Sequence, residues 1–143
     1  MNNLFNNACQ KFLDGYWIEA YSLFKEFLDS TSEVDLVDDA LLNLGLISIL
    51  LGNPEKAEMY FLRVIEEFPE AEIDTSFSHN EIGKSSLKAA YHLIEIALAK
   101  EDIITANNYF DKYFQDDDLF SGINNNENII SYAQLAKAKI SAL

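Results

Sequence analysis

Apolar residues recur at spacings of three and four along almost the whole chain of 143 residues. No stretch shows the sustained alternation of apolar and polar residues that is typical of a half-buried strand. The sequence therefore predicts an all-α protein with one domain, residues 1–143. The expected helices cover about residues 4–13, 17–28, 34–51, 54–68, 80–100, 103–114 and 129–140. Because most connections are short, helices that are neighbours in sequence are expected to pack as antiparallel hairpins.

Proline and capping residues set several of these boundaries. Pro54 suits a first helical turn, because the N–H that proline lacks would have no partner within the helix. Ser78 and Glu81 have the spacing of a capping box, which predicts that the fifth helix begins near residue 80. Asp102 is expected to cap the sixth helix.

The middle of the chain carries an ordered pattern of small, large and proline positions. It consists of Asn43-Leu44-Gly45, Gly52, Ala57, Phe61, Val64-Ile65 and Pro69. This pattern closely resembles the tetratricopeptide repeat (TPR) over its full length of about 34 residues. The same frame, with less complete matches, falls on Gly15 and Ala20 near the N-terminus and on Ala106 farther along.

The resemblance implies a right-handed helical-hairpin solenoid of about three TPR-like repeats, as in small, single-domain members of bacterial type. The repeats fall at about residues 1–33, 38–71 and 87–119, and a capping helix at about 127–142 closes the array. Glu101 stands where the third copy would have its turn glycine. The outer copies also lack the closing proline, so a related type of helical-hairpin repeat is an alternative.

Acidic side chains strongly outnumber basic ones, with 24 Asp and Glu against 10 Lys and Arg and a formal net charge of −14. So negative a chain is poorly suited to bind nucleic-acid phosphates or anionic lipids, and it favours a basic partner. The single cysteine, Cys9, excludes an intramolecular disulfide and a zinc site built from cysteines. No secretory signal and no apolar run of about 20 residues is evident, so we expect a cytoplasmic protein without a membrane span.

Three short strings resemble chemical motifs, but none predicts catalysis. The Gly-Lys-Ser string at 83–85 matches the end of a Walker A motif without its first glycine or a preceding strand. Residues 116–127 match only part of an EF-hand calcium loop. His92 and Glu95 have a spacing that can hold a metal, but no further ligand lies nearby in the sequence. We therefore expect no catalytic residue, no metal site and no cofactor, and a protein that is not an enzyme.

The resemblance also implies where a partner binds, because the first helix of each TPR hairpin lines the groove. The matching groove residues are Phe5, Cys9, Phe12, Leu42, Asn43, Leu46, Ile49, Lys88, Tyr91, His92 and Glu95. A second candidate surface is acidic and consists of Asp35, Asp38, Asp39, Asp116, Asp117 and Asp118.

These features favour a non-enzymatic module that binds a protein or peptide partner, through either the groove or the acidic surface. One alternative is an immunity protein that neutralises a basic toxin by charge complementarity. Another is a chaperone, similar to those of bacterial secretion systems, that holds an amphipathic helix in the groove. The acidic residues are equally compatible with a surface that only keeps the chain soluble, and the sequence leaves the oligomeric state open.

Overall fold

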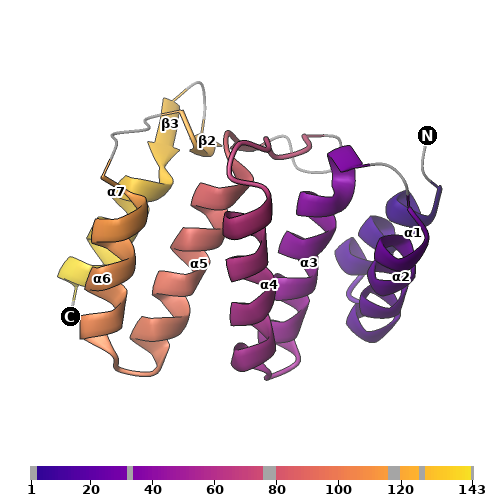
Figure 1. Cartoon of the computed structure of the whole chain (residues 1–143), viewed down its shortest axis with the longest axis horizontal. Coiled ribbons are helices and arrows are strands. Elements are labelled where there is room, and N and C mark those ends of the chain that lie inside the picture. Colours follow the sequence, from indigo (N-terminus) through magenta and orange to yellow (C-terminus); the bar gives the residue numbers. More distant parts are fainter. Residues whose placement is uncertain (1–2, 32–33, 76–79, 116–119, 126–127, 143) are drawn as a thin grey trace.

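The computed structural model describes residues 3–31, 34–75, 80–115, 120–125 and 128–142. Within these ranges the chain forms seven α-helices and three short strands (Figure 1). The helices are α1 (Asn3–Leu13), α2 (Trp17–Ser30), α3 (Val37–Leu50), α4 (Pro54–Glu67), α5 (Ser85–Ala99), α6 (Ile103–Tyr113) and α7 (Tyr132–Ser141), and a 3₁₀ turn, Val34–Leu36, leads into α3. The predicted predominance of helix is confirmed, and a small sheet is added that the periodicity did not indicate.

The helices follow one another as antiparallel hairpins in a row (Figure 1). α1 packs on α2, α3 on α4 and α5 on α6, and the hairpins adjoin through α2 with α3 and through α4 with α5. α7 packs on both α5 and α6 at the end of the row. Each helix buries the apolar stripe that its sequence provides; Phe24, Phe27 and Phe61, for example, are completely buried.

The two helices of each hairpin are joined by the same backbone turn. α1, α3 and α5 are each followed by a residue with positive φ: Gly15 at 86°, Gly52 at 80° and Glu101 at 61°. The next residue then donates its N–H to a carbonyl five positions earlier, as in a Schellman motif. The donors are Tyr16, Asn53 and Asp102, at 2.9, 2.8 and 2.9 Å. Glu101 therefore adopts the conformation that glycine adopts without strain in the other two turns.

The close approach of α3 and α4 depends on Gly45. A Cβ atom at this position would lie 2.6 Å from the ring of Phe61. Phe61 is completely buried, so its ring has little room to move away. A small residue at this point of the hairpin is what the TPR resemblance implied.

Capping residues explain where several helices begin. Pro54 is the first residue of α4, and the side chain of Asp102 accepts the N–H of Thr105 at 3.0 Å at the start of α6, both as predicted. The start of α7 differs from the prediction. Ser131 and Gln134 form a capping box, in which each side chain accepts the backbone N–H of the other residue, so the helix begins only at Tyr132.

The three strands, β1 (Glu81–Ile82), β2 (Gly122–Asn125) and β3 (Asn128–Ser131), form an antiparallel sheet in the order β1–β2–β3. Ile123 lies opposite Glu81 on one side and opposite Ile130 on the other. The predictions that the fifth helix starts near residue 80 and that the capping segment is helical from about residue 127 are therefore wrong. Ser78, the other half of the predicted capping box, lies outside the described residues.

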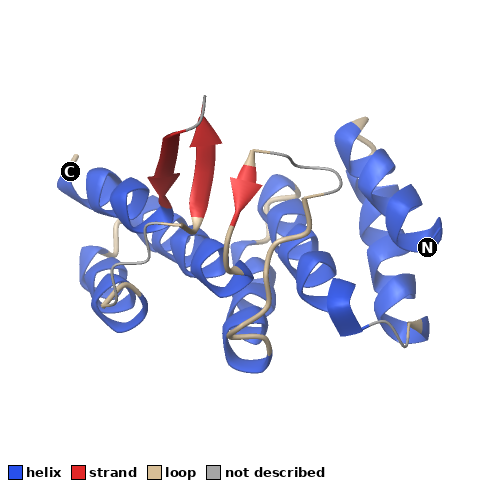
Figure 2. Ribbon diagram, turned by 90° about the horizontal axis from the view of Figure 1, so that it is seen from above, coloured by secondary structure: helices blue, strands red, loops and turns tan. Residues whose placement is uncertain are grey.

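The connection between α4 and α5 folds back along the helix ends and joins the sheet. The N–H of Ile73 donates to the carbonyl of Gly83 at 2.8 Å, and the N–H of Ser85 donates to the carbonyl of Ala71 at 3.0 Å. The sheet lies beside this connection, along the edge of the molecule where α5 begins (Figures 1 and 2). The fold thereby brings Asp74 against the start of α3.

Candidate functional site

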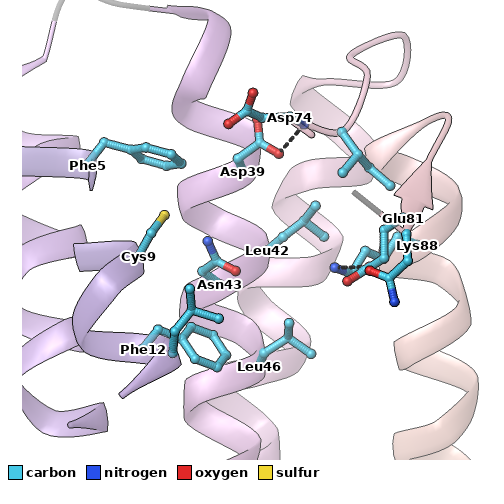
Figure 3. Close-up of a pocket in the computed structure, with 13 residues that line it drawn as sticks. Phe5, Cys9, Phe12, Asp39, Leu42, Asn43, Leu46, Asp74, Glu81 and Lys88 are labelled. Atoms are coloured by element: carbon cyan, nitrogen blue, oxygen red, sulfur yellow. Dashed lines mark hydrogen bonds and ion pairs between the residues drawn. The ribbon is translucent and has the colours of Figure 1, made fainter. Parts of the chain in front are cut away.

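A pocket of about 360 Å³ opens between α1, α3 and the start of α5 (Figure 3). α3 forms its floor, α1 forms one wall, and β1 with the start of α5 forms the opposite wall. The described residues that line it are Phe5, Cys9, Phe12, Leu13, Asp39, Leu42, Asn43, Leu46, Ile73, Asp74, Asn80, Glu81 and Lys88. Ligand pockets generally hold about 300–1,000 Å³, so this volume suits a small ligand or one or two side chains of a partner.

The pocket brings together seven predicted groove residues that come from three different helices. They are Phe5, Cys9 and Phe12 of α1, Leu42, Asn43 and Leu46 of α3, and Lys88 of α5. Their spacing of three and four within α1 and within α3 places each set on one helical face. The six apolar side chains of the lining, here called the apolar wall, are Phe5, Phe12, Leu13, Leu42, Leu46 and Ile73.

Of the other predicted groove residues on α5, Tyr91 and Glu95 contact α7, whereas His92 stacks on Phe61 of α4. The Tyr91 ring lies 5.7 Å from that of Tyr132, and the ammonium of Lys139 lies 2.5 Å from the Glu95 carboxylate. His92 Nδ1 is 2.6 Å from the same carboxylate. Tyr91, His92 and Glu95 therefore lie outside the described lining of the pocket, because α7 packs on Tyr91 and Glu95 and the ring of His92 packs on Phe61.

Ile49, the remaining predicted groove residue, lies on α3 outside the described lining of the pocket and is 37% exposed.

The Glu95 carboxylate stabilises the contact between α5 and α7 through its ion pair with Lys139. Its burial alone would raise the carboxyl pKa, but the hydrogen bonds with His92 and Lys139 outweigh burial and lower the pKa to about 2.

The structure corrects the predicted acidic surface. Asp35 is exposed, but Asp38 and Asp39 are only 1% and 6% exposed. Both lie in the first turn of α3, where the helix dipole favours negative charge, and the α4–α5 connection packs over them. Their burial shows that they are not part of a solvated acidic face. The rest of the prediction, Asp116, Asp117 and Asp118, lies outside the described residues.

The two buried aspartates connect α3 with later parts of the chain. Ser85 Oγ donates to Asp38 Oδ2 at 2.5 Å, and the N–H of Asp74 donates to Asp39 Oδ1 at 2.9 Å. The second oxygens, Asp38 Oδ1 and Asp39 Oδ2, are buried and have no hydrogen-bond partner among the described residues.

Burial raises the pKa of both carboxyl groups. For Asp39 the pKa is about 8, because burial and the adjacent charge of Asp38 outweigh the hydrogen bond from Asp74. For Asp38, burial likewise outweighs the hydrogen bond from Ser85. Asp39 is thus mostly protonated at pH 7 in the chain alone.

Two further groups define the chemistry of the pocket. Burial, assisted by the charges of Asp39 and Asp74, raises the pKa of the Cys9 thiol to about 12. The thiol is therefore neutral and a poor nucleophile. On the opposite wall the Lys88 ammonium forms an ion pair with Glu81. The pocket offers groups that bind a ligand: apolar surface, carboxyl groups and the amides of Asn43 and Asn80.

Five lining residues were not predicted from the sequence as binding residues: Leu13, Ile73, Asp74, Asn80 and Glu81. Four of them belong to the α4–α5 connection, which is longer than a standard repeat allows. Insertions in repeat proteins map to loops on one face, often the binding face. The length of this connection was thus a usable signal.

The Gly-Lys-Ser string at 83–85 has a packing role. A Cβ atom on Gly83 would lie 2.3 Å from the Cα atom of Ser121, so only glycine permits this contact. The N–H of Lys84 donates to Ser121 Oγ at 2.9 Å. These contacts hold the α4–α5 connection against the start of β2.

No protein-family model matches the chain, and no curated protein shows significant similarity to its sequence. Among the described residues there is no cluster of three or more His, Cys, Asp and Glu side chains that could hold a metal ion. Within the same ranges, every helix is too short or too polar to cross a membrane. The pocket itself therefore provides the argument for function.

Proposed function

We propose that the chain is a non-enzymatic interaction module, a right-handed array of about three TPR-like hairpins that binds a segment of a protein partner over α1 and α3. The observation that carries this proposal is the pocket, because equivalent positions of successive hairpins line it. Phe5 and Leu42 each lie ten residues before the turn glycine of their hairpin, and Cys9 and Leu46 each lie six residues before it. Repeating one surface position along an array is how repeat proteins build extended binding faces.

The lining of the pocket supports a peptide as the ligand. An apolar wall provides affinity, and the polar groups of the lining, among them Asp39 and Asn43, fix the orientation of what binds. Because α7 covers the equivalent face of α5, the partner segment contacts mainly the first two hairpins.

The experiment compares two variants that add the same charge at different places. Leu46→Glu puts a carboxylate into the pocket, whereas Met59→Glu puts one on α4, where Met59 is 69% exposed. Wild type and both variants serve as baits in an extract of the native host, after circular dichroism has shown that each variant folds. We expect wild type and Met59→Glu to retain the same partner and Leu46→Glu to lose it. Equal retention by Leu46→Glu would overturn the proposal.

A further inference from the structure

We propose that the pocket receives the side chain of a lysine or arginine from the partner segment, with its cationic group beside Asp39 and its aliphatic part along the apolar wall. The inference rests on the proposed function, because it names the chemistry of the partner at the same site. It concerns a buried carboxyl group and not the exposed acidic residues.

Asp39 provides the first argument. It lines the pocket and is 6% exposed, and Figure 3 shows its carboxylate between Phe5 on one side and the wall of Glu81 and Lys88 on the other. Oδ1 accepts the N–H of Asp74, but Oδ2 has no hydrogen-bond partner among the described residues. The ionised form of this buried group would lack a donor at Oδ2, and an ammonium or guanidinium group supplies that donor together with the opposite charge.

The balance of charge in the pocket provides the second argument. Among its described lining residues, Asp39, Asp74 and Glu81 are acidic and Lys88 is basic. The Lys88 ammonium pairs with Glu81, and this lining thus holds three carboxyl groups against one ammonium, an excess of acidic groups. A cation from a partner complements this excess, and the net charge of −14 attracts a basic partner from a distance.

The apolar wall decides which kind of cation fits. Phe5, Phe12, Leu42 and Leu46 contribute apolar surface along the pocket, with Phe12 and Leu46 at the end away from Asp39 (Figure 3). Lysine and arginine bury their methylene chains along such surface while the charged end reaches a polar partner, and aromatic ring faces also attract cations. A bare metal ion would leave this wall unused. The volume of about 360 Å³ accommodates a long side chain.

Binding of a cation to this carboxyl group is expected to release a proton. The charged and titratable groups around Asp39 are Cys9 on α1, Asp38 on α3, Asp74 in the α4–α5 connection, Glu81 on β1 and Lys88 on α5. Burial and the charges of Asp38 and Asp74 raise the Asp39 pKa to about 8 in the chain alone, against the hydrogen bond from Asp74 and the charge of Lys88, which lower it. A cation favours the ionised form, so affinity rises between pH 6 and pH 8, by up to about tenfold per unit.

The test starts from a random library of displayed 12-residue peptides, selected at pH 8 on the full chain and counter-selected on Leu46→Lys, which puts an ammonium into the pocket and repels a basic side chain. We expect the selected peptides to carry Lys or Arg flanked by apolar residues. One such peptide is then synthesised with its basic residue and with norleucine in that place, and affinities are measured by calorimetry. Norleucine is expected to weaken binding to wild type at least tenfold and to Asp39→Asn less than twofold. Asp35→Asn, which removes an exposed carboxylate from the turn before α3, keeps the tenfold difference.

The outcomes separate the inference from the proposed function. Selected peptides that depend on Leu46 but lack a basic residue, or that bind equally well with norleucine, overturn the inference and leave the proposed function standing. If no peptide depends on Leu46, both fail. If Asp39→Asn does not fold, the two peptides are compared on wild type at pH 6 and pH 8. A preference for the basic peptide that grows at least tenfold supports the inference, and a preference independent of pH overturns it.

Discussion

Replacing Asp39 with asparagine is expected to stabilise the folded chain at neutral pH. The new amide side chain would keep the shape of a neutral carboxyl group, and its carbonyl oxygen can still accept the N–H of Asp74, which now donates to Oδ1 at 2.9 Å. The substitution removes the need to bury an ionisable group whose second oxygen has no partner among the described residues.

The magnitude follows from the shift of the Asp39 pKa from 3.8 to about 8. Below pH 3.8 both the folded and the unfolded state carry the proton, so this residue imposes no penalty there. As the pH rises the unfolded chain ionises more easily than the folded one, and the folded state loses about 1.4 kcal/mol per pH unit until the pH reaches the folded pKa. The loss amounts to about 4 kcal/mol at pH 7, and Asp39→Asn is expected to recover most of it.

The assay is urea unfolding followed by circular dichroism at unit steps from pH 4 to pH 8. Wild type and Asp39→Asn should have similar free energies of unfolding at pH 4 and diverge as the pH rises, with the variant more stable. Asp35→Asn serves as the control, because Asp35 is exposed, and should follow wild type at every pH. The reasoning is refuted if Asp39→Asn is less stable than wild type at pH 7, or if the difference does not change with pH.

Three further predictions concern the frame around the pocket. Glu101→Gly removes the backbone strain of a non-glycine residue at φ 61° and should raise the free energy of unfolding by about 1 kcal/mol. Gly52→Ala introduces such strain at φ 80° and should lower the free energy of unfolding by a similar amount. Urea titrations measure both changes. The buried Cys9 thiol, with its pKa of about 12, should react with a thiol reagent at pH 7 at least about 100-fold faster once the chain is unfolded. The pKa of Glu95, lowered to about 2, implies stability that is present above pH 4.5 and is lost as the pH falls towards 2. Glu95→Gln should therefore cost about 1–2 kcal/mol at pH 7, after allowance for partial exposure, and little at pH 2 in thermal unfolding. These expectations are contradicted if Gly52→Ala is more stable than wild type, or if Cys9 reacts equally fast in the folded and the unfolded chain. They are also contradicted if Glu95→Gln lowers the free energy of unfolding by the same amount at every pH.

Two helix starts could be predicted from deciding residues that are close in sequence. Asp102 caps α6 through the N–H of Thr105, only three residues away, and Pro54 starts α4 directly after the turn at Gly52. Such local preferences act before any tertiary contact forms. The repeat frame, and not a local preference, placed Glu101 at the third turn, where it adopts the positive φ that glycine has in the other two turns.

The sheet could not be predicted in this way, because its strands are short and pair across distant parts of the chain. Glu81 lies opposite Ile123, and Gly122 lies opposite both Ile82 and Ser131. A Cβ atom on Gly122 would lie 2.1 Å from the carbonyl oxygen of Ile130, so glycine is needed for this pairing. The requirement for glycine at this position arises only from the pairing of strands in the folded chain.

The candidate site was predicted in part for the same physical reason. Helical spacing was sufficient to group Phe5, Cys9 and Phe12 on one face of α1. By contrast, the burial of Asp39 depends on the α4–α5 connection, which crosses the start of α3 from elsewhere in the sequence. The packing of α7 on Tyr91 likewise depends on a tertiary contact that no local sequence pattern indicates.

The central claim is that a partner segment lies in the pocket between α1 and α3. Site-specific photo-crosslinking tests it most directly, with benzoylphenylalanine replacing Phe12 in the pocket or Met59 on the exposed side of α4, in cells of the native host. The account predicts a crosslinked partner from position 12, lost when Leu46→Glu is added, and none from position 59. A partner that crosslinks from position 59 and not from position 12 would contradict it.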